Sequence, residues 1–166
     1  GGELAELRQY LCAQLMWDPR RDSMEIRDEF CRGYYGKAAP EVLEFLRRMD
    51  AVAEEPIHVF AVWDPPSIVS PSLAQDALRV LGRARAADDD PKIRNRIGRL
   101  MLPFWYTMLL SPAKYGLADK DAPAVWKKAR QVIADNKITF IRESGLPGGD
   151  ASAWLLEMDA RIVQEP

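Results

Sequence analysis

Residues 17–46 constrain the fold more than any other stretch, because their thirty positions hold two helix starts, a helix stop and two tight turns. Asp18 precedes a proline, and a residue in that position is pushed out of helical geometry, so a first helix ends here. Asp22 is an N-cap candidate for a second helix, and Gly36 is a good stop because glycine adopts positive φ without a Cβ penalty. Pro40 fits the first turn of a third helix.

Apolar residues recur at helical spacing through most of the remaining chain. Ser72, with Gln75 three positions later, has the spacing of a capping box and predicts the start of a fourth helix. We expect about seven helices, which begin near residues 3, 22, 40, 72, 91, 121 and 150. The predicted fold class is therefore all-α, an irregular antiparallel helical array or bundle, formed by a single domain over residues 1–166.

The helix predicted over residues 91–110 is apolar nearly all round from Leu100 onward, which is typical of a central helix. Asp90 is its expected N-cap. Pro103 lies inside this helix, and an interior proline typically costs about 3 kcal/mol. We therefore expect a kink or a break at Pro103, and a loop over residues 111–120.

The composition is typical of one globular domain: 166 residues, 48% of them hydrophobic, with a formal net charge of −2. Strong polyanion binding is not indicated, and no apolar run reaches the roughly 18 residues that span a bilayer. We expect neither a nucleic-acid partner nor a membrane contact. Cys12 and Cys31 fall on apolar helix faces, so buried free thiols are expected rather than a disulfide framework or a zinc site.

Seven basic side chains surround three consecutive aspartates, Asp88 to Asp90. They are Arg79, Arg83, Arg85, Lys92, Arg94, Arg96 and Arg99. Such a cluster can bind nucleic acid, but the acidic overall balance favours a solvated face of two helices. The aromatic residues fit helix faces and are expected mostly in the core.

The sequence contains none of the standard catalytic or cofactor-binding motifs: no GxSxG, HExxH, CxxC, phosphate loop or dinucleotide fingerprint. Five aspartates have a capping or turn explanation and three glutamates fall on expected solvent faces, so a catalytic carboxylate pair is not predicted. They are Asp18, Asp22, Asp90, Asp121, Asp150, Glu29, Glu44 and Glu143. We expect no catalytic residue, no metal site and no cofactor in this chain.

The proline-rich loop at residues 56–71 is the best candidate for a binding site, because a long irregular connection in a compact domain is often functional. Trp63, His58 and Asp64 lie in it and are the candidate residues for binding an oligosaccharide. Trp63 either faces a ligand or partner or fills the core, and His58 has an alternative interpretation as an exposed or structural histidine.

The start of the chain also carries a set of specific short motifs. They are Leu-Met-Trp-Asp-Pro at 15–19, Asp22, Asp28-Glu29-Phe30, and Gly-Tyr-Tyr-Gly-Lys-Ala-Ala-Pro at 33–40. On these motifs, residues 3–49 resemble a bacterial family, domain of unknown function 4838. A looser resemblance continues after residue 70, where residues 99–106 read Arg-Leu-Met-Leu-Pro-Phe-Trp-Tyr.

Members of that family look like glycoside hydrolases, in which this region follows a (β/α)-barrel similar to those of α-glucuronidases and β-hexosaminidases. The resemblance implies that the chain is the C-terminal helical part of a longer protein, exported to the periplasm or cell surface. The catalytic barrel would lie upstream and is not in this sequence.

The leading hypothesis is a non-catalytic accessory domain that packs on its own N-terminal barrel and supports a homo-oligomer. One alternative is a carbohydrate-binding module that uses the 56–71 loop. Another is a helical regulatory or dimerisation domain unrelated to carbohydrate. An exposed apolar patch would favour the first hypothesis over the last, since such a patch marks a missing partner.

Overall fold

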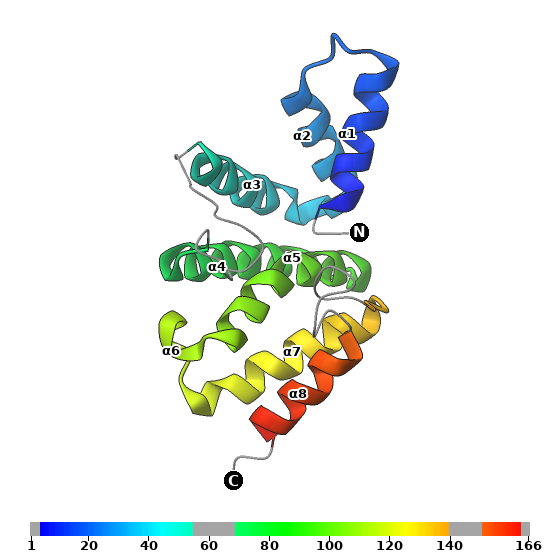
Figure 1. Cartoon of the computed structure of the whole chain (residues 1–166). Helices are drawn as coiled ribbons and strands as arrows, with labels where there is room; N and C mark the ends of the chain where they lie inside the picture. The colour runs from blue at the N-terminus through cyan, green and yellow to red at the C-terminus, as the bar shows by residue number, and fades with distance from the viewer. Residues whose placement is uncertain (1–3, 55–68, 140–150, 164–166) are drawn as a thin grey trace. The chain divides into compact units, whose positions relative to one another are not determined.

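The computed structural model describes residues 4–54, 69–139 and 151–163 (Figure 1). Within these ranges there is no strand, and seven helices have thirteen residues or more, which confirms the all-α prediction. The long helices are α1 (Ala5–Trp17), α2 (Ser23–Tyr35), α3 (Ala39–Ala53), α4 (Pro71–Ala87), α5 (Pro91–Leu110), α7 (Ala122–Asp135) and α8 (Ala151–Val163). The short ones are η1 (Gly36–Ala38), α6 (Pro112–Tyr115) and η2 (Asp119–Asp121).

The chain divides into two compact units, Gly1–Pro103 and Phe104–Pro166. The boundary falls directly after Pro103, inside α5, which is nevertheless one continuous helix. The helix is therefore not broken at this proline, and the kink that we expected as the other outcome stays a prediction. The single domain over residues 1–166 also stays a prediction.

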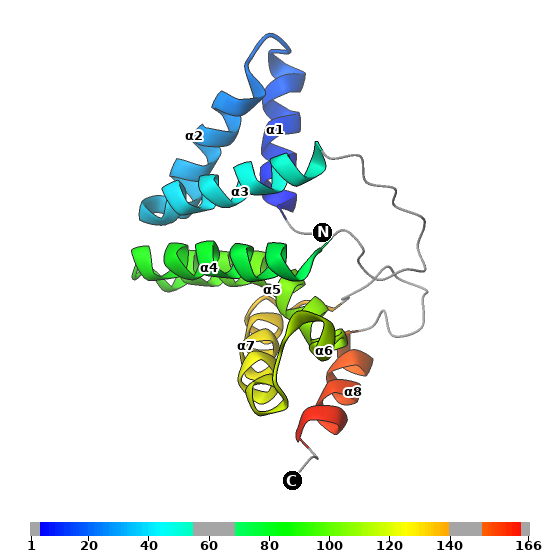
Figure 2. The ribbon, with the colours of Figure 1, turned by 90° about the vertical axis from the view of Figure 1, so that its left-hand side faces the viewer.

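The first unit begins with an α1–α2 hairpin, followed by α3, which packs against both α2 and α4 (Figure 2). Asp22 caps α2 as predicted, because its Oδ1 accepts hydrogen bonds from the backbone N–H groups of Met24 at 2.7 Å and Glu25 at 3.0 Å. Gly36 ends α2 with φ at +52°. Pro40 lies in the first turn of α3, again as predicted.

The contact between α3 and α4 forms much of the first unit's core. α3 contributes the buried side chains of Val42, Phe45 and Leu46. α4 contributes mostly small residues to this contact. Each has a side chain that is at most 2% exposed: Ala74, Ala77, Val80, Leu81 and Ala84. Small side chains on one helix let the two backbones approach closely.

The predicted N-cap of α4, Ser72, is wrong, and the observed cap lies two residues earlier. Ser70, not Ser72, caps the helix, and its hydroxyl accepts a hydrogen bond from the Leu73 backbone N–H at 3.1 Å. The physical reason is Pro71, which supplies a helical φ and needs no N–H partner at the first helical position. The helix therefore starts at the proline, and its cap is the residue before it.

The second unit contains the end of α5, then α6, η2, α7 and α8. The predicted loop at 111–120 is partly wrong, because Pro112 starts the four-residue helix α6. α7 packs on α8. Trp126 and Trp154 meet edge to face with ring centroids 5.1 Å apart, and the Trp126 indole N–H donates to Asp159 Oδ1 at 2.8 Å.

Candidate interaction surface

The predicted binding residues Trp63, His58 and Asp64 lie outside the described residues. The oligosaccharide site in the 56–71 loop therefore stays a prediction.

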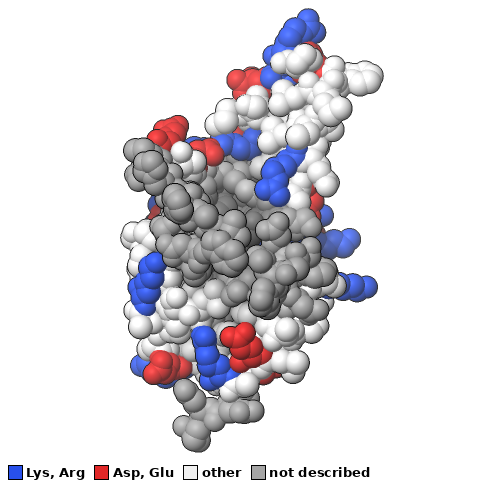
Figure 3. All heavy atoms as spheres, in the orientation of Figure 1, with Lys and Arg blue, Asp and Glu red and all other residues white. Residues whose placement is uncertain are grey.

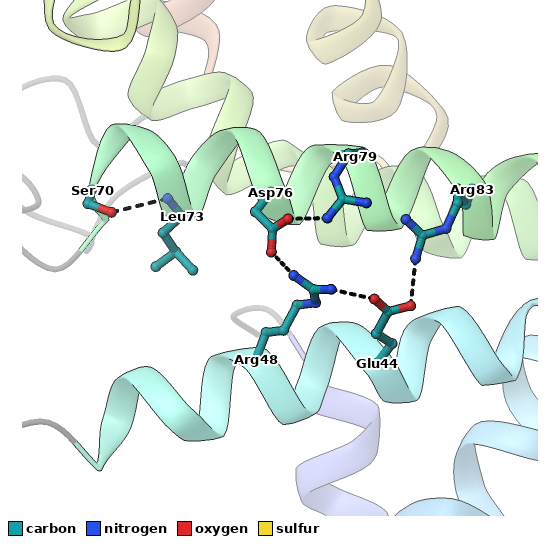
Figure 4. Close-up of polar contacts among 7 residues, drawn as sticks. All are labelled: Glu44, Arg48, Ser70, Leu73, Asp76, Arg79 and Arg83. Carbon is teal, nitrogen blue, oxygen red and sulfur yellow. Dashed lines mark hydrogen bonds and ion pairs between the residues drawn. The ribbon is translucent and has the colours of Figure 1, made fainter.

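A chain of ion pairs ties α3 to α4 (Figure 4). Glu44 on α3 accepts hydrogen bonds from Arg48 one turn later and from Arg83 on α4, both at 2.5 Å. Arg48 also pairs with Asp76 on α4, which in turn pairs with Arg79. The five side chains alternate in sign across the helix pair, so each charge has an opposite neighbour and the network acts as a structural clasp.

These arginines hold the carboxyl groups ionised. Hydrogen bonds from Arg48 and Arg83 lower the pKa of Glu44, and hydrogen bonds from Arg79 and Arg48 lower the pKa of Asp76. In the described residues, each carboxyl group with a resolved pKa shift is shifted downward: Glu6, Asp18, Glu29, Glu44, Asp76 and Asp88. This direction is opposite to the raised pKa of a glycosidase general acid.

Most of the basic cluster around Asp88 to Asp90 is likewise used inside the first unit. Arg99 pairs with Glu6 at 2.6 Å, and Arg94 pairs with Asp89 at 2.7 Å. Arg96 donates to the backbone carbonyl of Tyr34 at 2.5 Å, and its guanidinium lies 3.9 Å above the ring of that tyrosine. These contacts tie part of the cluster to other residues of the first unit, and the interpretation of the whole cluster as a solvated face of two helices stays a prediction.

The expected burial of Cys12 is wrong, and Trp17 is an exception among the aromatic residues expected mostly in the core, both for the same reason. Cys31 is buried as expected, and burial raises the pKa of its thiol to about 11. Cys12 is exposed, and Trp17 is 90% exposed. The inner face of α1 carries the leucines, and Leu7 is buried. Since successive helical residues turn by about 100°, Cys12 and Trp17 point away from that face.

Exposed large apolar side chains gather where α1 ends and α2 begins. Met16 is 86% exposed, Trp17 90% and Met24 50%. We call residues 16–24 the hairpin tip. It is the closed end of the α1–α2 hairpin, and in Figures 1 and 2 it lies at the end away from α3. Neither methionine was predicted to be exposed; the available signal was a Met-Trp pair that lies off the leucine face directly before a helix stop.

Polar contacts brace the hairpin next to the tip. Glu29 on α2 accepts the Tyr10 hydroxyl of α1 at 2.6 Å and the Arg21 guanidinium at 2.7 Å. Arg21 also donates to Gln14, back on α1. Asp18 accepts the Arg20 side chain at 2.9 Å. The turn is therefore fixed to both helices, while the apolar side chains remain outside the network.

Two further features of the described residues bear on the kind of surface. None of the helices there is long and apolar enough to cross a membrane. No group of three or more potential metal-ligating side chains occurs among the same residues.

The comparisons with known proteins single out this part of the chain. No curated protein and no solved structure matches the sequence. Residues 1–47 match the model of the family described as "Domain of unknown function (DUF4838)". The looser resemblance after residue 70 lies outside the match and stays a prediction. For the segment that contains the α1–α2 hairpin and the first half of α3, the match confirms the predicted resemblance and supports membership of that family.

Proposed function

We propose that the chain is a non-catalytic helical accessory domain of a glycoside-hydrolase-like protein. It packs on the (β/α)-barrel of that protein and contributes no acid or base to the reaction. The observation that carries the proposal is the hairpin tip, because Met16, Trp17 and Met24 expose their side chains inside the segment that matches the family model. An exposed apolar cluster of this kind is typical of a surface that meets another protein.

The charges of the described residues support a scaffold role. The Glu44–Arg48–Asp76 clasp and the Arg99–Glu6 pair connect one helix to another. Neighbouring arginines lower the pKa values of these carboxyl groups and keep them ionised, which suits a rigid support. An accessory domain needs this rigidity so that its exposed surface keeps a fixed shape for its partner.

The proposal is tested by two measurements on purified proteins. The chain alone should show no turnover of aryl glycosides, including those of uronic acids and amino sugars. Mixed with a separately produced barrel domain of the same protein, it should form a complex in isothermal titration calorimetry. Clear turnover by the chain alone, or no complex with the barrel, would refute the proposed function.

A further inference from the structure

The exposed sulfur-containing side chains gather on the α1–α2 hairpin. The sequence has six methionines and two cysteines, and all eight lie within the described residues. Three of them are exposed: Cys12, Met16 at 86% and Met24 at 50%. The other five are half-buried or buried: Cys31, Met49, Met101, Met108 and Met158. Because the oxidation of sulfur follows its exposure, an oxidant in the solvent meets residues 12–24 first.

The thioethers of Met16 and Met24 take no part in the hydrogen bonds that shape the hairpin tip. The Arg21 backbone N–H donates to the carbonyl oxygen of Asp18 at 3.2 Å, which closes the turn. The side chain of Asp22 caps α2. These bonds join backbone groups and a carboxylate, so a chemical change at either thioether leaves them in place.

The charge of the hairpin tip favours an uncharged oxidant. Residues 16–24 contain two arginines and two aspartates, so their formal net charge is 0. In addition, Arg20 pairs with Asp18, and Arg21 pairs with Glu29. The end of the hairpin in Figure 3 accordingly shows basic, acidic and uncharged surface together. A charged reagent is attracted by a field of one sign, whereas hydrogen peroxide and small organic hydroperoxides need none.

We propose that Met16 and Met24 are sites of reversible oxidation, at which a hydroperoxide converts each thioether to a sulfoxide. A lone pair of the sulfur attacks one peroxide oxygen, the S–O bond forms and the O–O bond breaks. The proton of the transferred oxygen moves to the leaving oxygen, which departs as water or as an alcohol. The sulfur loses two electrons and the peroxide gains them. An apolar side chain thereby becomes polar, so the tip loses part of its apolar surface.

This inference does not rest on the function proposed above, because it concerns the chemistry of the chain by itself. A partner that covers the tip would shield both thioethers from peroxide. The modification therefore belongs to the chain whose tip is free.

Burial distinguishes the methionines of the tip from those of the core. Met158 is 0% exposed and Met101 8%. A sulfoxide at either position would place a polar oxygen among apolar side chains, and burying an unpaired polar group is unfavourable. At Met16 the same oxygen stays in water and keeps its hydration. Oxidation confined to the tip should therefore leave the helices folded.

The exposure of Met16 also determines how its oxidation is reversed. A thioether whose side chain is 86% exposed is open to peroxide from both sides, so both sulfoxide epimers should form. Each of the two classes of methionine sulfoxide reductase reduces one epimer. With a thiol as electron donor, either class alone should restore about half of Met16, and both together should restore all of it. A sulfoxide that neither class reduces would overturn the reversibility.

The first test is peroxide treatment of the full chain with Cys12 alkylated, followed by mass spectrometry of tryptic peptides. Trypsin separates Met16 in peptide 9–20 from Met24 in peptide 22–27. Both should be oxidised at least about tenfold faster than Met158, because susceptibility follows exposure. In urea the three rates should become equal, which controls for intrinsic reactivity. Equal rates in the folded chain would overturn the inference.

The second test measures the change in surface character. Retention on a phenyl column should fall when peroxide oxidises the tip, while circular dichroism at 222 nm stays the same. A variant with both Met16→Leu and Met24→Leu keeps the apolar volume without the sulfur, so its retention should not respond to peroxide. Met49→Leu is the matched control and should respond like the wild type. A response in the double variant, or a loss of helix signal in the wild type, would overturn the inference.

Discussion

Two glycines three positions apart should respond to alanine in opposite directions. Gly33 lies inside α2, is exposed, and an added Cβ would have no heavy atom within 4 Å. Alanine is about 0.8–1.0 kcal/mol better than glycine in a helix interior, so Gly33→Ala should raise the free energy of unfolding by about 0.5–1 kcal/mol. The substitution adds no contact and acts through the backbone alone.

Gly36 is the opposite case. Its φ of +52° with ψ of −127° lies in a region that is essentially reserved for glycine, and a side chain held there costs about 1–3 kcal/mol. The new Cβ would lie 2.8 Å from Ile93 Cδ1 and 3.0 Å from Asp88 Oδ2. The Ile93 methyl can rotate away. The Asp88 carboxylate is less free, because it accepts the backbone N–H of Lys37 at 3.1 Å and of Asp90 at 3.0 Å.

The two variants should therefore differ by about 1.5–4 kcal/mol in the free energy of unfolding. Urea denaturation followed by circular dichroism at 222 nm, a wavelength chosen for helix content, measures the difference through the midpoint. Gly36→Asn should fare no better than Gly36→Ala, because asparagine tolerates the left-handed helical region and the ψ of Gly36 lies outside it. The reasoning is refuted if both alanine variants shift the midpoint in the same direction.

Three shorter predictions concern the cap, the thiols and the charge clasp. Ser70→Ala should lower the free energy of unfolding by about 1 kcal/mol. Ser72→Ala should change it by less than about 0.5 kcal/mol. The urea midpoints of the two variants measure this difference, and equal losses would contradict Ser70 as the cap. Ellman's reagent at pH 8 should label Cys12 rapidly and Cys31 only after unfolding, since Cys31 is fully buried and its raised thiol pKa leaves little thiolate; two fast thiols would be the contrary result. Because the pKa of Glu44 is lowered, its ion pairs stabilise the fold above the ordinary pKa of 4.5, and this stabilisation is lost as the pH falls below that value. The Glu44→Gln variant should therefore be less stable than the wild type at pH 7. It should also lose less stability than the wild type on acidification. Parallel pH profiles of the two proteins would count against this.

The helix boundaries could be predicted from the sequence because their causes are local. A cap, a proline or a glycine acts within four residues, so Asp22, Gly36 and Pro40 mark ends that the structure confirms. Ser70 shows the limit of this approach. A serine lies on each side of Pro71. Ser70 is the N-cap because α4 begins at the proline itself, and the sequence pattern did not show this.

The sequence by itself determined that the chain is all-α, because helical periodicity and capping leave no other secondary structure for the described residues. Tertiary structure decided which helix faces are covered. Cys12 and Trp17 belong to an apolar helix, yet they are exposed because the leucine face of α1 is the one turned inward. Pairing across long sequence distances was also decided there: Glu44 meets Arg83, 39 residues away, only because α3 and α4 pack together. Local patterns carry no information about such contacts, since these depend on where the whole chain places each helix.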